Sequence, residues 1–105
     1  RREDLEDFQS GLDFILDIIK PRWVAEILYC LEEDSSSFSH LLEAIPFLNR
    51  TELNRKLHFL MERGVIIKSM ENHRSSYRLT KLGKDLVHIF HHFVDLAEYH
   101  HKKMA

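Results

Sequence analysis

The sequence predicts a mainly helical α+β domain in which four helices are followed by a β-hairpin and a fifth helix. Apolar residues recur at spacings of three and four over most of the chain, and only residues 65–80 have the short β-branched and alternating pattern of strands. Only three glycines and two prolines interrupt the 105 residues, which favours helices with short connections. This length allows one domain, residues 1–105.

The first two helices are predicted on either side of Pro21. Apolar residues recur at helical spacing through residues 4–20, and Pro21 is expected to end that helix and to begin the next, over residues 21–33. A polar break follows at residues 34–37. Cys30, the single cysteine, is expected to be a small buried apolar residue, with a redox sensor as the alternative. One cysteine cannot form an internal disulfide, which fits a reducing cytoplasm.

A helix-turn-helix is predicted over residues 39–63. Residues 38–45 give a short helix with Ser39 as the expected N-cap. Asn49 and Glu52 stand three residues apart, in the pattern of a capping box that starts a longer helix directly after Asn49. A short helix, a tight turn and a longer basic helix form the arrangement in which the second helix enters the DNA major groove.

Residues 65–80 are expected to form a wing after the second of these helices. Two short strands, residues 65–70 and 76–80, flank a polar turn. Gly64 is the expected C-cap of the preceding helix, and Thr80 is the expected N-cap of a long last helix. The predicted order α-α-α-α-β-β-α is that of a winged helix-turn-helix.

The charge distribution favours a polyanionic partner for the middle of the chain. The formal net charge is −2, but residues 1–49 carry 4 Lys/Arg and 11 Asp/Glu, whereas residues 50–84 carry 9 Lys/Arg and 3 Asp/Glu. Because salt screens charges beyond about 8–10 Å, a DNA-binding protein needs a local positive face and not a basic total. A solvated charged surface is the alternative interpretation of this segment.

The residue types at the start of the second helix suit base recognition. Arginine pairs with guanine, asparagine pairs with adenine, and threonine offers a hydroxyl and a methyl group. The predicted DNA-binding residues, with two from the wing, are Asn49, Arg50, Thr51, Asn54, Arg55, Lys56, His58, His73 and Arg74.

Four motifs in order carry a family resemblance. They are LDIIKPRWVAEILYCL (16–31), Phe38-Ser39-His40-Leu41, Pro46 ahead of LHFLMERGV (57–65), and Tyr77-Arg78-Leu79-Thr80-Lys81-Leu82-Gly83. Over nearly its whole length the chain resembles the HxlR-type branch of the MarR-like winged-helix regulators. Two features depart from that family: the wing is shorter and lacks a frequent proline, and the cysteine near the N-terminus of many redox-sensing members is absent.

The resemblance implies a cytoplasmic bacterial or archaeal transcriptional regulator. It also implies a homodimer formed through the first and last helices, residues 1–20 and 81–101. An excess of aromatic residues on these helices independently favours a subunit interface. The residues expected there are Leu5, Phe8, Leu12, Phe90, Phe93 and Leu96. The expected partner is double-stranded DNA, read as a pseudo-palindromic operator by a repressor or an activator.

Other classes of function are weakly supported. His88 and His92 have a spacing that suits a metal ion, but a polar or dimer-facing surface is the simpler interpretation, and no metal or cofactor is expected. A pH-sensitive dimer is a further alternative. The chain lacks a glycine-rich phosphate loop and a nucleophile with a convincing base, so no enzyme is predicted. No membrane association is expected. A small-molecule effector is an open alternative partner, and the sequence does not identify it. The remaining alternative is a winged-helix protein-interaction module without DNA binding.

Overall fold

The computed structural model describes the backbone of residues 2–104 and the side chains of residues 4–70 and 72–102. Residue 1 of the first predicted helical segment and residue 105 of the predicted domain lie outside the described residues. In chain order, the elements are α1 (Arg2–Ile19), α2 (Val24–Cys30), β1 (Ser36–Ser37), α3 (Phe38–Ala44), α4 (Arg50–Glu62), β2 (Ile66–Glu71), β3 (Arg74–Leu79) and α5 (Lys81–Met104). The predicted winged helix-turn-helix is confirmed, with one strand in addition.

The additional strand, β1, completes a three-stranded antiparallel sheet in the order β1-β3-β2. Ser36 and Ser37 pair with Tyr77 and Ser76 of β3. The sequence predicted a polar break at this place, because a two-residue strand is too short to show an alternating pattern. β1 joins the segment before the helix-turn-helix to the wing.

Two helix starts differ from the prediction. α2 begins at Val24 and not at Pro21, because Trp23 adopts a left-handed conformation with φ 78° that a helix cannot contain. α3 is capped by Ser37, whose hydroxyl accepts a hydrogen bond from the His40 amide at 3.1 Å. Ser39, the predicted cap, is already inside the helix. Ser37 is therefore both the end of β1 and the cap of α3.

The core is built around one face of α4. Leu53, Leu57 and Leu60 are fully or almost fully buried there. They belong to a buried cluster that also contains Ile18, Val24, Ile27, Leu28, Leu41, Val65, Ile66, Leu79, Leu86 and Val87. Met61 is half-buried and packs against this cluster. In the described part of α1, Ile18 is the one residue that is fully buried.

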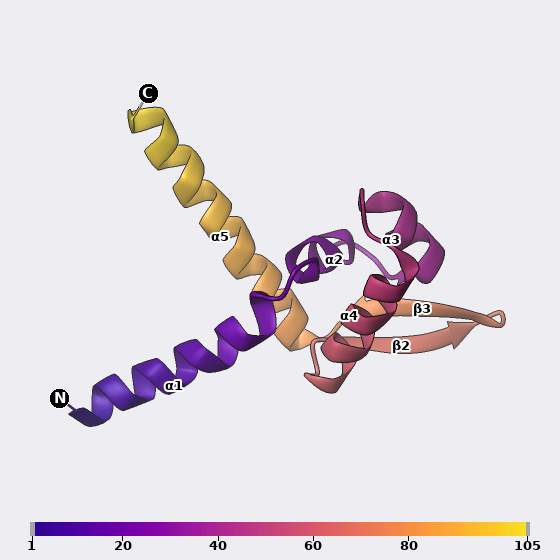
Figure 1. Ribbon diagram of the computed structural model, residues 1–105, viewed down its shortest axis with the longest axis horizontal. Coiled ribbons are helices and arrows are strands. Elements are labelled where there is room, and N and C mark those ends of the chain that lie inside the picture. The colour runs from indigo at the N-terminus through magenta and orange to yellow at the C-terminus, as the bar shows by residue number, and fades with distance from the viewer. Residues whose placement is uncertain (1, 105) are drawn as a thin grey trace.

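The wing is a tighter hairpin than the predicted five-residue turn. Glu71 pairs with Arg74, so only Asn72 and His73 lie between the strands. Both have positive φ, 50° and 66°, as a two-residue turn of type I′ requires. The hairpin projects beyond the helical body in Figure 1.

α1 and α5 also project from the body (Figure 1). They have 18 and 24 residues, and they leave the body in different directions. Within the described residues, no helix is both long enough and apolar enough to cross a membrane.

Candidate nucleic-acid interface

α4 has a buried leucine face and an exposed polar face. Its N-cap is Asn49, as predicted: the Asn49 Oδ1 atom accepts a hydrogen bond from the Glu52 amide at 2.8 Å. All nine predicted DNA-binding residues except Lys56 are exposed. Because helical residues recur every 3.6 positions, the exposed members of the first turns lie together, away from the leucines.

The Glu52 carboxylate holds two of the predicted cations. Arg55 Nη1 donates to Glu52 Oε1 at 3.0 Å, and Lys56 Nζ lies 3.4 Å from Glu52 Oε2. The Arg55 side chain stays 69% exposed, whereas that of Lys56 is only 18% exposed. The capping-box pattern suggested that this carboxylate faces the Asn49 backbone, but its hydrogen bonds are made with the next turn of the helix.

Two other predicted residues are oriented by neighbours. The Arg50 guanidinium lies 5.8 Å from the centre of the Phe38 ring, a cation–π contact between α4 and the start of α3. His58 Nδ1 lies 2.8 Å from the Asn54 carbonyl oxygen, one helical turn earlier. Because a carbonyl only accepts, Nδ1 carries the proton and Nε2 is left for another partner.

The wing contributes the remaining predicted residues, His73 and Arg74. His73 is the second turn residue and Arg74 is the first residue of β3, and both are exposed. The positive φ of His73 comes from the turn itself, so its side chain is presented at the tip of the hairpin. The structure therefore places the predicted residues in two sets, one on the first turns of α4 and one at the hairpin tip.

A cluster of hydrogen bonds joins the end of α4 to the start of α5. Gly64, the predicted C-cap of α4, has φ 72° and stands directly after the observed C-cap, Arg63. The Thr80 hydroxyl oxygen lies 2.6 Å from the Gly64 carbonyl oxygen and accepts from the Gly83 amide at 3.3 Å, which confirms Thr80 as the cap of α5. The Thr80 amide donates to the Val65 carbonyl at 3.0 Å. A Cβ atom on Gly83 would collide with that same carbonyl oxygen.

Phe47, in the turn before α4, was not among the residues predicted for the interface. Its side chain is 95% exposed, and its φ is 69°. Left-handed backbone costs a residue other than glycine about 1–2 kcal/mol. A large aromatic residue in a left-handed turn is unusual. The one sequence signal for this turn was the position of Phe47 between a proline and an N-cap residue.

The residues predicted at a subunit interface lie on the projecting parts of α1 and α5. Leu5, Phe8 and Leu12 are 57%, 64% and 44% exposed. On α5, Phe93 and Leu96 are exposed, while Phe90 is half-buried and packs against the core. The structure therefore leaves five of the six predicted interface residues exposed on the single chain.

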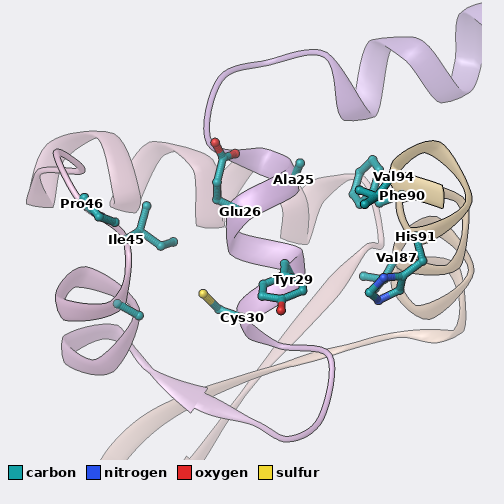
Figure 2. A pocket seen from close by; sticks show the side chains of 11 residues that line it. Ala25, Glu26, Tyr29, Cys30, Ile45, Pro46, Val87, Phe90, His91 and Val94 are labelled. Atoms are coloured by element: carbon teal, nitrogen blue, oxygen red, sulfur yellow. The ribbon is translucent and has the colours of Figure 1, made fainter. Parts of the chain in front are cut away.

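A groove of about 530 Å³ crosses the outer face of α2, and we call it the α2 groove. Its lining is mostly apolar and comes from α2 (Ala25, Glu26, Tyr29, Cys30), the end of α3 and its turn (Ala44, Ile45, Pro46), and α5 (Val87, Phe90, His91, Val94). Figure 2 shows Ile45 and Pro46 on one side of α2 and Phe90 and Val94 on the other.

Cys30 lies in this groove and is half-buried. Burial raises the pKa of the Cys30 thiol, and the nearby Glu26 carboxylate raises it further. A raised pKa lowers the fraction of reactive thiolate at neutral pH, which favours the packing role over the sensor role.

The histidines of α5 are mostly exposed to solvent. Among the described residues, no group of three or more His, Cys, Asp or Glu side chains could hold a metal ion, so His88 and His92 gain no further ligand there. His91 Nε2 instead lies 2.8 Å from Glu32 Oε1, which links α5 to the segment that follows α2.

Comparison with known proteins agrees with this geometry. A family model described as HxlR-like helix-turn-helix matches residues 18–105. A protein described as a MarR-family transcriptional regulator from Enterococcus faecalis V583 is 19% identical over 91% of this chain and 90% of its own, with a TM-score of 0.85. A second such protein, from Porphyromonas gingivalis W83, is 23% identical over 83% and 88%, with a TM-score of 0.76. The reduced form of the transcriptional regulator YodB from B. subtilis is 20% identical over 84% and 89%, with a TM-score of 0.77.

No curated protein matches the sequence. The solved structures share too little sequence to show more than the fold, but the family model extends over most of the chain. The chain belongs to the HxlR-like helix-turn-helix family of transcriptional regulators.

Proposed function

We propose that the protein is a sequence-specific DNA-binding regulator that binds a pseudo-palindromic operator as a homodimer in the cytoplasm. The observation that carries the proposal is the two-faced α4. Its leucines anchor it in the core, while Arg50, Thr51, Asn54 and Arg55 are exposed on its first turns. A helix held in this way can enter the major groove and present these side chains to base edges.

The Glu52 carboxylate has a defined part in this proposal. It draws Arg55 back along the helix and holds Lys56 close to the protein surface. In the DNA complex Arg55 leaves Glu52 for a guanine or a phosphate, since its side chain is well exposed. The Glu52 carboxylate then lowers the affinity for all DNA sequences, because it repels phosphates. Arg55 is the residue that selects a base.

His73 and Arg74 at the tip of the wing contact the sugar–phosphate backbone or the adjacent minor groove in this proposal. Arg74 supplies the positive charge, and the tight turn places it at the far end of the hairpin. A dimer related by a two-fold axis presents two α4 helices to half-sites one helical turn apart, or a multiple of that spacing.

The first experiment is retention of a random DNA pool on the purified protein across a salt series. Recovery of an inverted repeat, with affinity that falls steeply as salt rises, is the expected result. The Arg55→Ala variant is expected to lose about 1–3 kcal/mol of specific binding, and the Glu52→Gln variant to bind more tightly with a steeper salt dependence. Absence of any retained DNA at low salt would argue against the proposal.

The pairing of Arg55 and Lys56 with Glu52 is the one observation that favours a protein-interaction module instead, since paired cations present less free positive charge. The Glu52→Gln variant separates the two functions. A DNA-binding protein gains DNA affinity when the carboxylate is neutralised, whereas an interaction module has no DNA affinity to change.

A further inference from the structure

The turn between α3 and α4 holds an aromatic residue in a strained position. The Leu48 amide donates to the Ile45 carbonyl at 3.4 Å, so residues 45–48 form a four-residue turn. Phe47 is the third residue of this turn and has φ 69°. Turns with positive φ at their third residue favour glycine, because a Cβ atom crowds the backbone there. A phenylalanine at this place therefore lowers the stability of the turn.

The Phe47 ring makes little contact with its own chain. Ile45 and Leu48, on either side, are buried, whereas Phe47 is the most exposed of the large apolar residues that the structure describes. The lining of the α2 groove includes Pro46 but not Phe47. A single exposed apolar residue is common on protein surfaces. A strained one whose side chain adds no packing points to a function.

Phe47 stands next to the residues of α4 that are proposed to read DNA. Asn49 is the N-cap of α4, and Arg50 and Thr51, its first two residues, are exposed. Because three residues of chain span at most about 11 Å, the Cα atoms of Phe47 and Arg50 are no farther apart than this. A base-pair step along DNA rises about 3.4 Å, so the distance is at most about three base pairs. When the start of α4 enters the major groove, the Phe47 ring lies in the groove or at its edge.

The turn holds the ring in a defined place relative to α4. Pro46 restricts the backbone on one side of Phe47, and Leu48 anchors the other side in the core. The ring therefore has little freedom to move away from the surface that carries Arg50 and Thr51. A side chain held in this way can add to base recognition without a large loss of conformational entropy on binding.

An aromatic ring in the major groove suits one feature of the base edges. These edges present hydrogen-bond donors and acceptors, and their one large apolar group is the C5-methyl group of thymine. The Phe47 ring carries no charge and no hydrogen-bonding group, so it does not compensate a phosphate that it would cover. Contact with a thymine methyl group removes apolar surface of both partners from water.

We infer that Phe47 contacts a thymine methyl group in each half-site of the operator. This inference rests on the proposed DNA-binding function and deepens its specificity. It adds an apolar base contact, made from the turn, to the polar contacts made from α4. The strained and exposed ring of the free protein then has its use in the DNA complex.

The test uses the purified protein and the inverted repeat recovered from the random DNA pool. Each thymine of the repeat is replaced in turn, in both half-sites, by deoxyuridine, which lacks only the C5-methyl group. For wild type, loss of the contacted methyl group is expected to weaken binding about four-fold for each half-site, since a buried methyl group contributes roughly this factor. Fluorescence anisotropy of labelled DNA measures the affinities.

Three substitutions at one position assign the contact. Phe47→Gly and Phe47→Ala both remove the ring, and glycine also removes the strain of the turn. Both variants are expected to bind the repeat several-fold more weakly with an unchanged salt dependence, because an apolar contact releases no counterions. Deoxyuridine at the contacted position is expected to weaken their binding no further. Phe47→Leu keeps an apolar side chain and is expected to retain most of the preference for thymine.

The controls separate this contact from other roles of the ring. Phe47→Gly is expected to be at least as stable as wild type, so its weaker binding does not come from unfolding. Sedimentation is expected to give the same oligomeric state for wild type and Phe47→Gly. A change of that state would overturn the inference, because the ring would then contact a second copy of the chain.

The deoxyuridine series also distinguishes this inference from the proposed function. Wild type that retains an inverted repeat, but shares its deoxyuridine profile with Phe47→Gly and Phe47→Ala, loses only the inference. A recovered repeat that contains no thymine has the same consequence. Wild type that retains no DNA at low salt loses the proposed function, and the thymine contact with it.

Discussion

The Thr80 hydroxyl oxygen lies 2.6 Å from the carbonyl oxygen of Gly64, so the cap of α5 is hydrogen-bonded to the residue that closes α4. The Thr80 amide and the Val65 carbonyl, 3.0 Å apart, add a second link between the same two places. The two strands of the wing lie between Val65 and Thr80 in the chain. The candidate DNA-binding helix, the wing and the last helix are therefore joined at one point.

Replacement of Thr80 by valine removes the hydroxyl but keeps the β-branched shape. The change is expected to lower the free energy of unfolding by about 1–2 kcal/mol, because α5 loses its N-cap and the Gly64 carbonyl loses a donor. Urea denaturation measures the effect. Thr80→Ser keeps the hydroxyl and is expected to retain most of the stability; equal losses in both variants would contradict this role for the hydroxyl.

Gly83 and Gly11 form a matched pair for a glycine-to-alanine test. A Cβ atom on Gly83 collides with the Val65 carbonyl oxygen, whereas a Cβ atom on Gly11 meets nothing within 4 Å. Gly83→Ala is expected to lower the free energy of unfolding by about 1–3 kcal/mol. Gly11→Ala, in the interior of α1, is expected to raise it by roughly 0.5–1 kcal/mol. Thermal melts of both variants check the pair, and the same sign of change in both would contradict it.

Phe47 offers a test of backbone strain. Its φ of 69° suits glycine, and its exposed ring makes little contact that the change could remove. Phe47→Gly is expected to be at least as stable as wild type and more stable than Phe47→Ala by up to about 1 kcal/mol, because alanine keeps the left-handed strain. Chemical denaturation of the three proteins decides the order. An alanine variant more stable than the glycine variant would mean that the turn is not strained.

Cys30 is expected to make the free energy of unfolding fall as the pH becomes alkaline. Its pKa is raised in the folded protein by burial and by Glu26, so the folded state holds this proton more tightly than the unfolded state does. The stabilisation is present below the unfolded pKa and is lost as pH rises from there through the higher folded pKa. From about pH 7 to pH 10, wild type is expected to lose more stability than Cys30→Ala. Parallel pH dependences for the two proteins would contradict the raised pKa.

Three features set by local interactions were predicted from the sequence, although the equally local cap of α3 at Ser37 was not. The start of α4 depends on Asn49 and the amide three residues later, and both are visible as a motif. Gly64 and Thr80 are likewise recognisable as residues that end and begin helices. In each case the physical cause lies within one helical turn of its effect.

Features that depend on distant partners could not be predicted. β1 exists because Ser36 and Ser37 meet β3 some forty residues later in the chain. The α2 groove brings together residues near positions 25, 45 and 90, and none of them marks a groove by itself. The pairing of Glu52 with Arg55 and Lys56 competes with a capping interaction that the sequence suggests equally well.

The length of α5 sets how far one of its ends moves when the helix tilts about the other. Its 24 residues make a rod of about 36 Å, fixed at Thr80 beside α4 and exposed at its far end. A tilt of about 5° at the far end displaces the near end by roughly 3 Å, close to the rise of one base pair along DNA. In the proposed dimer, a change in the angle between the two copies of α5 is expected to change the spacing at which the two copies of α4 fit the same DNA.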